Sequence, residues 1–237
     1  MQNDSRQLEH SLQSVVQCIQ RGDFAKADFY LGPIRHYGDA RVHYFTGVIA
    51  QASGNHDNAI ASFCQSAVLD NFNPELTADC IFKLIGLGAL DKASDLTRQS
   101  AIKNPGYFGY LFCSGLIHLH RNELEQAVGK FRQTQRLRPD LIEAHMLAAQ
   151  TLHLMGRLSE SEDAYLAALL LAPGNAKLHE NLAALLLDCE EFSAAYDHSK
   201  KAVSLANQSA SAWALLRFSA RELKLLDEAL AAAEQAW

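Results

Sequence analysis

One spacing, thirty-four residues, constrains the fold of this chain more than any other feature of its sequence. Small, aromatic and proline positions between Phe108 and Pro173 occur twice in the same order. The first set is Gly115, Asn122, Ala127, Phe131 and Pro139, and the second, thirty-four residues later, is Ala149, Gly156, Ser161, Tyr165 and Pro173. Small side chains let two helices cross closely, and proline cannot continue a helix. The stretch therefore predicts two successive helix pairs.

The same register extends in both directions along the chain. Small residues at the expected helix crossing are Ala59, Ala93, Ala127, Ser161, Ala195 and Ala229. Residues suited to a left-handed turn between the two helices are Gly54, Gly88, Asn122 and Gly156. The position that ends each pair holds Asn71, Pro105, Pro139, Pro173 and Asn207. We expect the left-handed residue to end the first helix of each pair and the proline position to end the second.

This pattern resembles the tetratricopeptide repeat, a helix pair of thirty-four residues. The resemblance implies an all-α fold, namely a right-handed superhelical solenoid of antiparallel helix pairs. We expect a degenerate helical hairpin or cap at residues 1–39 and a repeat array at residues 40–237. The expected repeats are 40–73, 74–107, 108–141, 142–175, 176–209 and the incomplete 210–237.

The two ends of the chain depart from the regular pattern. Ala27 precedes Ala59 by thirty-two residues, and Gly32-Pro33 should end the helix that begins near Phe24. We therefore expect an irregular first unit, as terminal repeats usually are. The run Ala229 to Trp237 is almost entirely apolar, which favours either a fragment of a longer protein or an end that docks on another surface.

Composition narrows the class of protein. Hydrophobic residues make up 49% and charged residues 20% of the chain, which is too apolar for disorder. A net charge of -6 argues against nucleic acid as a partner. The start of the chain lacks the apolar run of a signal peptide, no stretch suits membrane insertion, and the five scattered cysteines read as reduced thiols. These features predict a cytoplasmic protein.

Chemical motifs are lacking. We find no nucleophile elbow, no phosphate-binding loop and no zinc-protease helix, so we expect no enzyme activity and no cofactor in these residues. The 10 histidines raise the question of a metal. His43, His145 and His179 occupy the position that the family gives to tryptophan, where a ring packs with its polar edge toward water, so we expect structural histidines and no metal site.

The resemblance also implies where a partner would bind, because the first helices of successive repeats line a concave groove. The family's groove-facing positions fall on Tyr44, Phe45, Val48, Phe82, Phe112, Leu116, Met146, Gln150, Lys177 and Asn181. Repeats that bind acidic chaperone tails carry a clamp of Lys, Asn and Arg, and here only Lys177 and Asn181 fit. Repeats similar to those of O-linked sugar transferases carry a regular asparagine, and Asn181 alone fits.

An aromatic groove that becomes polar toward one end suits a peptide or an amphipathic helix of a partner. The leading hypothesis is a protein-interaction scaffold. Self-coverage of the groove, by residues 29–39 or by a second copy in a homodimer, is the structural alternative. A rival function is an amino-terminal substrate-presenting or dimerisation module, since bacterial proteins of this kind often continue into a glycosyltransferase, sulfotransferase, methyltransferase or oxygenase domain.

Overall fold

The computed structural model describes residues 2–235, which form fourteen α-helices and one short 3-10 turn, with no strand in that range. The chain divides into two compact units, residues 1–120 and 121–237. Unit 1 contains α1 (Gln2–Gln20), α2 (Phe24–Leu31), η1 (Gly32–Ile34), α3 (Ala40–Ala52), α4 (His56–Leu69), α5 (Pro74–Gly86), α6 (Leu90–Lys103) and α7 (Phe108–His120). Unit 2 contains α8 (Leu124–Leu137), α9 (Ile142–Leu154), α10 (Leu158–Leu171), α11 (Ala176–Asp188), α12 (Phe192–Leu205), α13 (Ala210–Glu222) and α14 (Leu226–Gln235).

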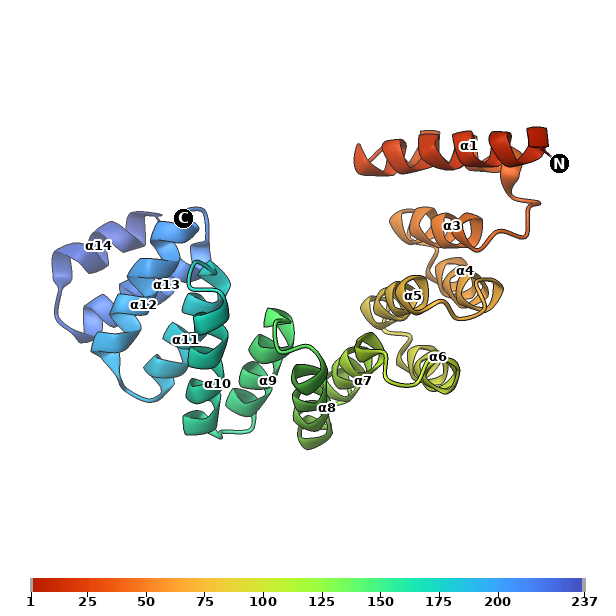
Figure 1. Ribbon diagram of the computed structural model, residues 1–237. Helices are drawn as coiled ribbons and strands as arrows, with labels where there is room; N and C mark the ends of the chain where they lie inside the picture. Colours follow the sequence, from red (N-terminus) through yellow and green to blue (C-terminus); the bar gives the residue numbers. More distant parts are fainter. Residues whose placement is uncertain (1, 236–237) are drawn as a thin grey trace. The chain divides into compact units, whose positions relative to one another are not determined.

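Within each unit, consecutive helices pack against one another in chain order (Figure 1). In unit 1, α1 contacts α2, α3 contacts α4, α5 contacts α6, and α7 contacts both α5 and α6. In unit 2 the same contacts run from α8 on α9 to α13 on α14. The expected fold class, an all-α solenoid of antiparallel helix pairs, is confirmed. The division into a cap at 1–39 and an array at 40–237 stays a prediction.

Within each unit, the row of small residues lies where the helices of a pair cross. Ala59 and Ala93 in unit 1, and Ser161 and Ala195 in unit 2, are all 0% exposed. Ala127 of α8, in the same row, is also 0% exposed. Ala229, at the same position in α14, is only half-buried. No described helix follows α14 to cover it, whereas the earlier crossings are covered by a later helix.

Two residues face each other across the helices of a pair, and which of them is the larger differs between the first two pairs. In the first pair, Gly47 leaves room for the ring of Phe63: a Cβ at Gly47 would lie 2.7 Å from Phe63 Cε1. In the next pair the same two positions hold Ile81 and Thr97, both buried. The larger residue is thus on the second helix of the first pair and on the first helix of the next pair. Thr97 also donates its hydroxyl to the Ala93 carbonyl at 2.7 Å, so its polar atom has a partner.

The turn between the helices of each pair has one residue in the left-handed conformation. Gly54, Gly88, Asn122 and Gly156 have φ between 60° and 74°, as expected. The row continues beyond the sequence prediction, because Glu190 and Lys224 have φ of 61° and 63° at the next two positions of the register. Neither residue favours this conformation, so helix packing holds the backbone there against local preference.

The amino-terminal hairpin has a core of its own. Leu12 and Val15 of α1 pack with Ala27 and Leu31 of α2. α2 ends at Leu31, and the turn η1 follows at Gly32, as the Gly-Pro pair predicted. α2 is thus 8 residues long, whereas α4 has 14. A short second helix gives the first pair the irregular form expected of it.

The Gly47→Ala substitution should destabilise the protein, because its methyl group would overlap the Phe63 ring. Overpacking of this kind costs about 1–3 kcal/mol. Gly129→Ala in α8 is the matched control, since nothing lies within 4 Å of a Cβ there. It should stabilise by about 1 kcal/mol through helix propensity. Urea unfolding of the three proteins measures both effects, and a neutral Gly47→Ala would contradict the packing argument.

The Glu190→Gly substitution should raise the free energy of unfolding by about 1 kcal/mol, because glycine adopts positive φ without steric cost. Gly156→Ala, at the equivalent turn, should lower it by a similar amount. Chemical denaturation measures both values. If Glu190→Gly were destabilising, the turn at residue 190 would depend on the side chain and not on the backbone.

Candidate functional site

In unit 1 the expected groove residues of α3 are partly covered by the chain itself. The Tyr44 hydroxyl donates a hydrogen bond to Asp79 of α5, and burial, followed by this carboxylate, raises the pKa of Tyr44 above its usual range. Phe45 packs against the core of the amino-terminal hairpin, and Val48 is half-buried. The first helices are therefore joined side by side here, with limited open surface.

The remaining expected residues of unit 1 differ in accessibility. Phe82 of α5 is 53% exposed, Phe112 of α7 is half-buried, and Leu116 is buried at 8%. Cys113 lies next to Phe112 and its Sγ donates to the Ala78 carbonyl at 3.8 Å. Burial raises the pKa of the Cys113 thiol to about 12. Of this group, Phe82 offers the largest accessible apolar surface.

In unit 2 the expected residues lie on α9 and α11. Met146 packs against the core between these helices and Gln150 is exposed. Lys177 is exposed and its Nζ lies 2.7 Å from Glu180 Oε1, whereas Asn181 is half-buried. The Lys177 ammonium therefore has a carboxylate partner already, which weakens any clamp for an acidic tail.

Asn181 lines a pocket of about 640 Å³ between α11 and α13. Its lining combines apolar residues with polar or aromatic ones. The apolar residues are Ala184, Leu187, Ala214 and Leu215, and the polar or aromatic ones are Glu180, Asn181, Asp188, Ser211, Arg217 and Phe218. The two first helices of neighbouring pairs thus form the sides of a groove in unit 2.

The carboxylate of Glu180 fixes one end of this pocket. Lys177 Nζ and Ser211 Oγ donate to Oε1 at 2.7 and 2.6 Å, and Ser209 Oγ donates to Oε2 at 3.2 Å. Burial alone raises the pKa of Glu180, but these hydrogen bonds together outweigh it and the pKa lies below its usual range. At the other end, Asp188 Oδ2 lies 2.7 Å from Nε2 of His153 on α9.

Glu180, Asp188 and Phe218 also fall at groove positions of the family, and of the residues that line the pocket only Arg217 was missed by the sequence. Arg217 is exposed and lines the pocket, although it occupies the position that holds Gly47, Ile81, Ala149 and Ala183 in other repeats. The family's groove positions do not include it. Among the described residues, neither Arg217 nor Asn181 makes a side-chain hydrogen bond, so both can bind a partner. The departure from a small residue was the one signal that marked Arg217.

His145 and His179, at the family's tryptophan position, correct one expectation, and Trp213 at the same position behaves in the same way. The polar edge of these rings was expected to face water, but it is bonded to the backbone. Nε2 of His145 lies 3.0 Å from the Pro139 carbonyl, Nε2 of His179 lies 3.0 Å from the Pro173 carbonyl, and Nε1 of Trp213 donates to the Asn207 carbonyl at 2.8 Å. In each case the ring satisfies a carbonyl six residues earlier, in the loop that closes the preceding pair.

His179 also contacts a second histidine. Its Nδ1 lies 2.9 Å from Nδ1 of His198 on α12, and His179 is 3% exposed. A carbonyl can only accept, so Nε2 of His179 carries the proton that it donates to Pro173. Its Nδ1 is then the acceptor, and His198 is the donor. Burial, followed by the nearby His179, lowers the pKa of His198 below its usual value.

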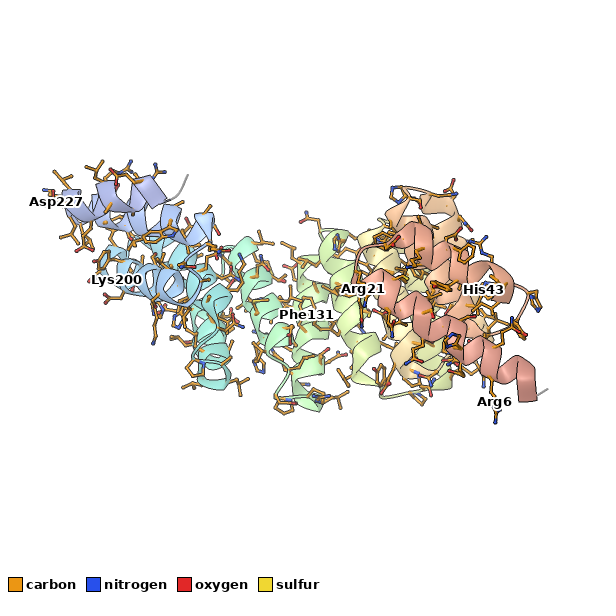
Figure 2. The ribbon with its side chains drawn as sticks, turned by 90° about the horizontal axis from the view of Figure 1, so that it is seen from above. Arg6, Arg21, His43, Phe131, Lys200 and Asp227 are labelled. Atoms are coloured by element: carbon orange, nitrogen blue, oxygen red, sulfur yellow. The ribbon has the colours of Figure 1, made fainter. Side chains whose placement is uncertain are left out.

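Other polar groups join neighbouring helices on the outer surface. Lys200, labelled in Figure 2, donates to Tyr196 Oη at 3.0 Å and lies 3.7 Å from Glu228 of α14. All five cysteines are free thiols. Over the described residues, no group of three or more His, Cys, Asp or Glu side chains is placed to bind a metal. No described helix has the length and hydropathy needed to cross a bilayer.

Comparison with known proteins agrees with this arrangement. Residues 142–175 match the model of the tetratricopeptide repeat family. A tetratricopeptide repeat protein from Parabacteroides merdae ATCC 43184 is 17% identical, with a TM-score of 0.73, over 98% of this chain and 92% of that one. No curated protein matches the sequence.

Two further solved structures have the same fold. The Pseudomonas aeruginosa pilF structure is 16% identical, with a TM-score of 0.68, over 89% of this chain and 96% of that one. A chain of the APC/C hetero-tetramer Cut9-Hcn1 is 16% identical, with a TM-score of 0.66, over 88% of this chain. The match spans 42% of that chain's length.

The fold and its repeating contacts define a class of protein, an α-helical repeat array with a pocket between α11 and α13. Helix pairs at one spacing, left-handed turns in register and the match at residues 142–175 agree with one another. Residues 142–175 are a tetratricopeptide repeat, and the chain has the fold of tetratricopeptide repeat proteins.

The His179–His198 contact predicts a stability loss on mild acidification. Since the folded pKa of His198 lies below its ordinary value of 6.5, the unfolded chain binds the proton more readily. This contribution is fully present above about pH 6.5 and decreases as the pH falls below it. Asp197 and Lys201 also act on His198, in opposite directions. His198→Gln keeps a donor for His179 without the titration.

Free energies of unfolding measured between about pH 7.5 and 5.5 check this expectation. The decrease toward low pH should be smaller for His198→Gln than for the unaltered protein. An equal decrease in both proteins would show that other groups carry the pH dependence.

Proposed function

We propose that this protein is a non-catalytic interaction scaffold that binds a peptide or an amphipathic helix of a protein partner. The observation that carries the proposal is the pocket between α11 and α13, whose lining is part apolar and part polar. Such a groove accepts apolar anchors of a peptide, while the polar groups bind its backbone and polar side chains. The tetratricopeptide fold supports the general role of a scaffold for protein–protein interaction.

The chemistry of the polar and aromatic lining residues favours a peptide over a small anion. Phe218 is 42% exposed and has the Arg221 guanidinium 4.7 Å from its ring centroid. Asn181 and Arg217 offer hydrogen-bond donors, and Asp188 offers an acceptor. An extended segment needs donors and acceptors along its length and an apolar contact between them. This pocket supplies both within α11 and α13.

The ten groove residues expected from the resemblance differ in how far their position supports a role in binding. Asn181 lies in the pocket, and Phe82 offers an exposed ring in unit 1. Phe45 packs against the amino-terminal hairpin, which favours self-coverage at that residue. A homodimer that covers the groove and a cytoplasmic location remain proposals. No observation in the fold or the comparisons favours the rival module of a larger enzyme.

A peptide-display experiment tests the groove. A library of random 16-residue peptides would be selected against the full chain, and the selected peptides would be titrated against purified variants by fluorescence polarisation. Phe218→Ala and Asn181→Ala should each weaken binding by about tenfold, as expected for an anchor contact or a buried hydrogen bond. Circular dichroism would show that helicity is retained.

Leu170→Ala is the matched control, because Leu170 is 87% exposed on α10 and does not line the pocket. It should leave the affinity unchanged. Selected peptides whose affinity depends on Leu170 and not on Phe218 or Asn181 would place the binding surface elsewhere and refute the groove assignment.

A further inference from the structure

A second pocket in unit 2 arises from one unfilled position in the repeat. In the last two repeats, the ring at the tryptophan position faces a residue nineteen positions later, on the second helix. Trp213 packs against the cluster that contains Ala232, so a large ring is matched with a small residue. His179 is matched with His198, at a ring-centroid separation of 5.1 Å. Both combinations fill the space between the two helices.

The preceding repeat has the smaller member at both positions. His145 stands where the others have Trp213 and His179, and Ala164 stands where the next repeat has His198. A cavity of about 380 Å³ is found here, with His145 and Ala164 among the residues that line it. It also borders Ala148, where the next repeat has the larger Leu182. The cavity is thus the space that the second imidazole ring occupies one repeat later.

The polar lining gives this cavity a chemical preference. Nε2 of His145 donates to the Pro139 carbonyl at 3.0 Å, so Nδ1 of the neutral ring is an acceptor. In the next repeat the equivalent Nδ1 accepts from His198, whereas Ala164 offers no donor. The cavity therefore has a ring nitrogen that needs a hydrogen-bond donor at a defined place.

Charge in the cavity supports the same preference. Asp163 lines it and, among the described residues, makes no side-chain hydrogen bond. The equivalent Asp197 acts on His198 by favouring its protonated form. The next repeat also has Lys201, which acts in the opposite sense, but Ala167 replaces it here. Arg132, which also lines the cavity, is paired with Glu160 at 3.1 Å. The unpaired charge in the cavity is negative.

We propose that this cavity binds an imidazole ring, whose N–H donates to Nδ1 of His145. The ring would come from a histidine of a partner protein or from a small imidazole compound, since both present the same group. The site lies between α8, α9 and α10 and shares no residue with the groove between α11 and α13. It is independent of the proposed peptide groove.

Titration of the full chain by ¹H–¹⁵N NMR at pH 8 tests the proposal. The probe is 4-methylimidazole, which has the ring of a histidine side chain. Amide signals of His145, Asp163 and Ala164 should shift and saturate with a dissociation constant on the order of millimolar, as expected for so small a ligand. 1-Methylimidazole has the same ring without the N–H, and it should bind about tenfold more weakly.

Two variants close the cavity in the ways that the chain itself uses. Ala164→His reproduces the pair His179–His198, and His145→Trp reproduces the match of Trp213 with Ala232. Both should lose the response to 4-methylimidazole, and circular dichroism should show unchanged helicity. Because the two fill the space from different helices, a folding defect in one leaves the other as the test. Leu166→His adds a histidine to α10 outside the cavity lining and should keep the response.

N-acetylhistidine methylamide distinguishes the two sources of the ring. Equal binding of this compound and 4-methylimidazole indicates a partner's histidine, whereas binding of 4-methylimidazole alone indicates a free small base. Absence of shifts at His145 and Ala164 at about 50 mM 4-methylimidazole, well above a millimolar dissociation constant, would overturn the proposal. Equal shifts with 1-methylimidazole, or an unchanged response in both closing variants, would also overturn it.

Discussion

The close crossing of two helices within each pair is the contact on which the remaining structure depends. The side chains around the crossing must fill the space between the two helices, because interiors are packed at crystal-like density. Gly47 with Phe63 and Ile81 with Thr97 do so with the larger residue on opposite helices. The glycine on one helix and the aromatic residue on the other, which the family prefers, are thus one way to fill the crossing. The chain uses others where the sequence departs from the family.

The left-handed turn is the second consequence of that crossing. The second helix must reverse direction within three or four residues, and one backbone residue with positive φ allows it. Glycine makes this turn cheaply, yet Glu190 and Lys224 adopt the same conformation. Tertiary packing therefore overrides local preference at the last two turns, and the sequence alone did not reveal them because neither residue marks a turn.

The sequence predicted helix pairs, their spacing and the buried small residues because these depend on local period and on side-chain size. The loop prolines and Gly32-Pro33 also marked helix ends correctly. Contacts between repeats were harder to predict from the sequence. The hydrogen bonds from His145, His179 and Trp213 to backbone carbonyls could not be predicted from the sequence. Whether the nitrogen of a half-buried ring bonds to water or to the backbone depends on the distance to the nearest carbonyl in the folded protein. Likewise Leu116, assigned to the groove by its position, is buried, and Arg217 lines the pocket from a position where a small interior residue was expected.

The ring-to-carbonyl bonds in unit 2 have a consequence for how its repeats respond to stress. Each bond joins a side chain of one pair to the terminal loop of the pair before it, so its free energy belongs to neither pair alone. In a linear array such shared terms act between nearest neighbours and determine cooperativity. Loss of one pair would leave the carbonyl of its predecessor without its donor, in addition to the lost packing. The helix pairs of unit 2 are thereby coupled in thermal unfolding, and none of them unfolds independently of its neighbours.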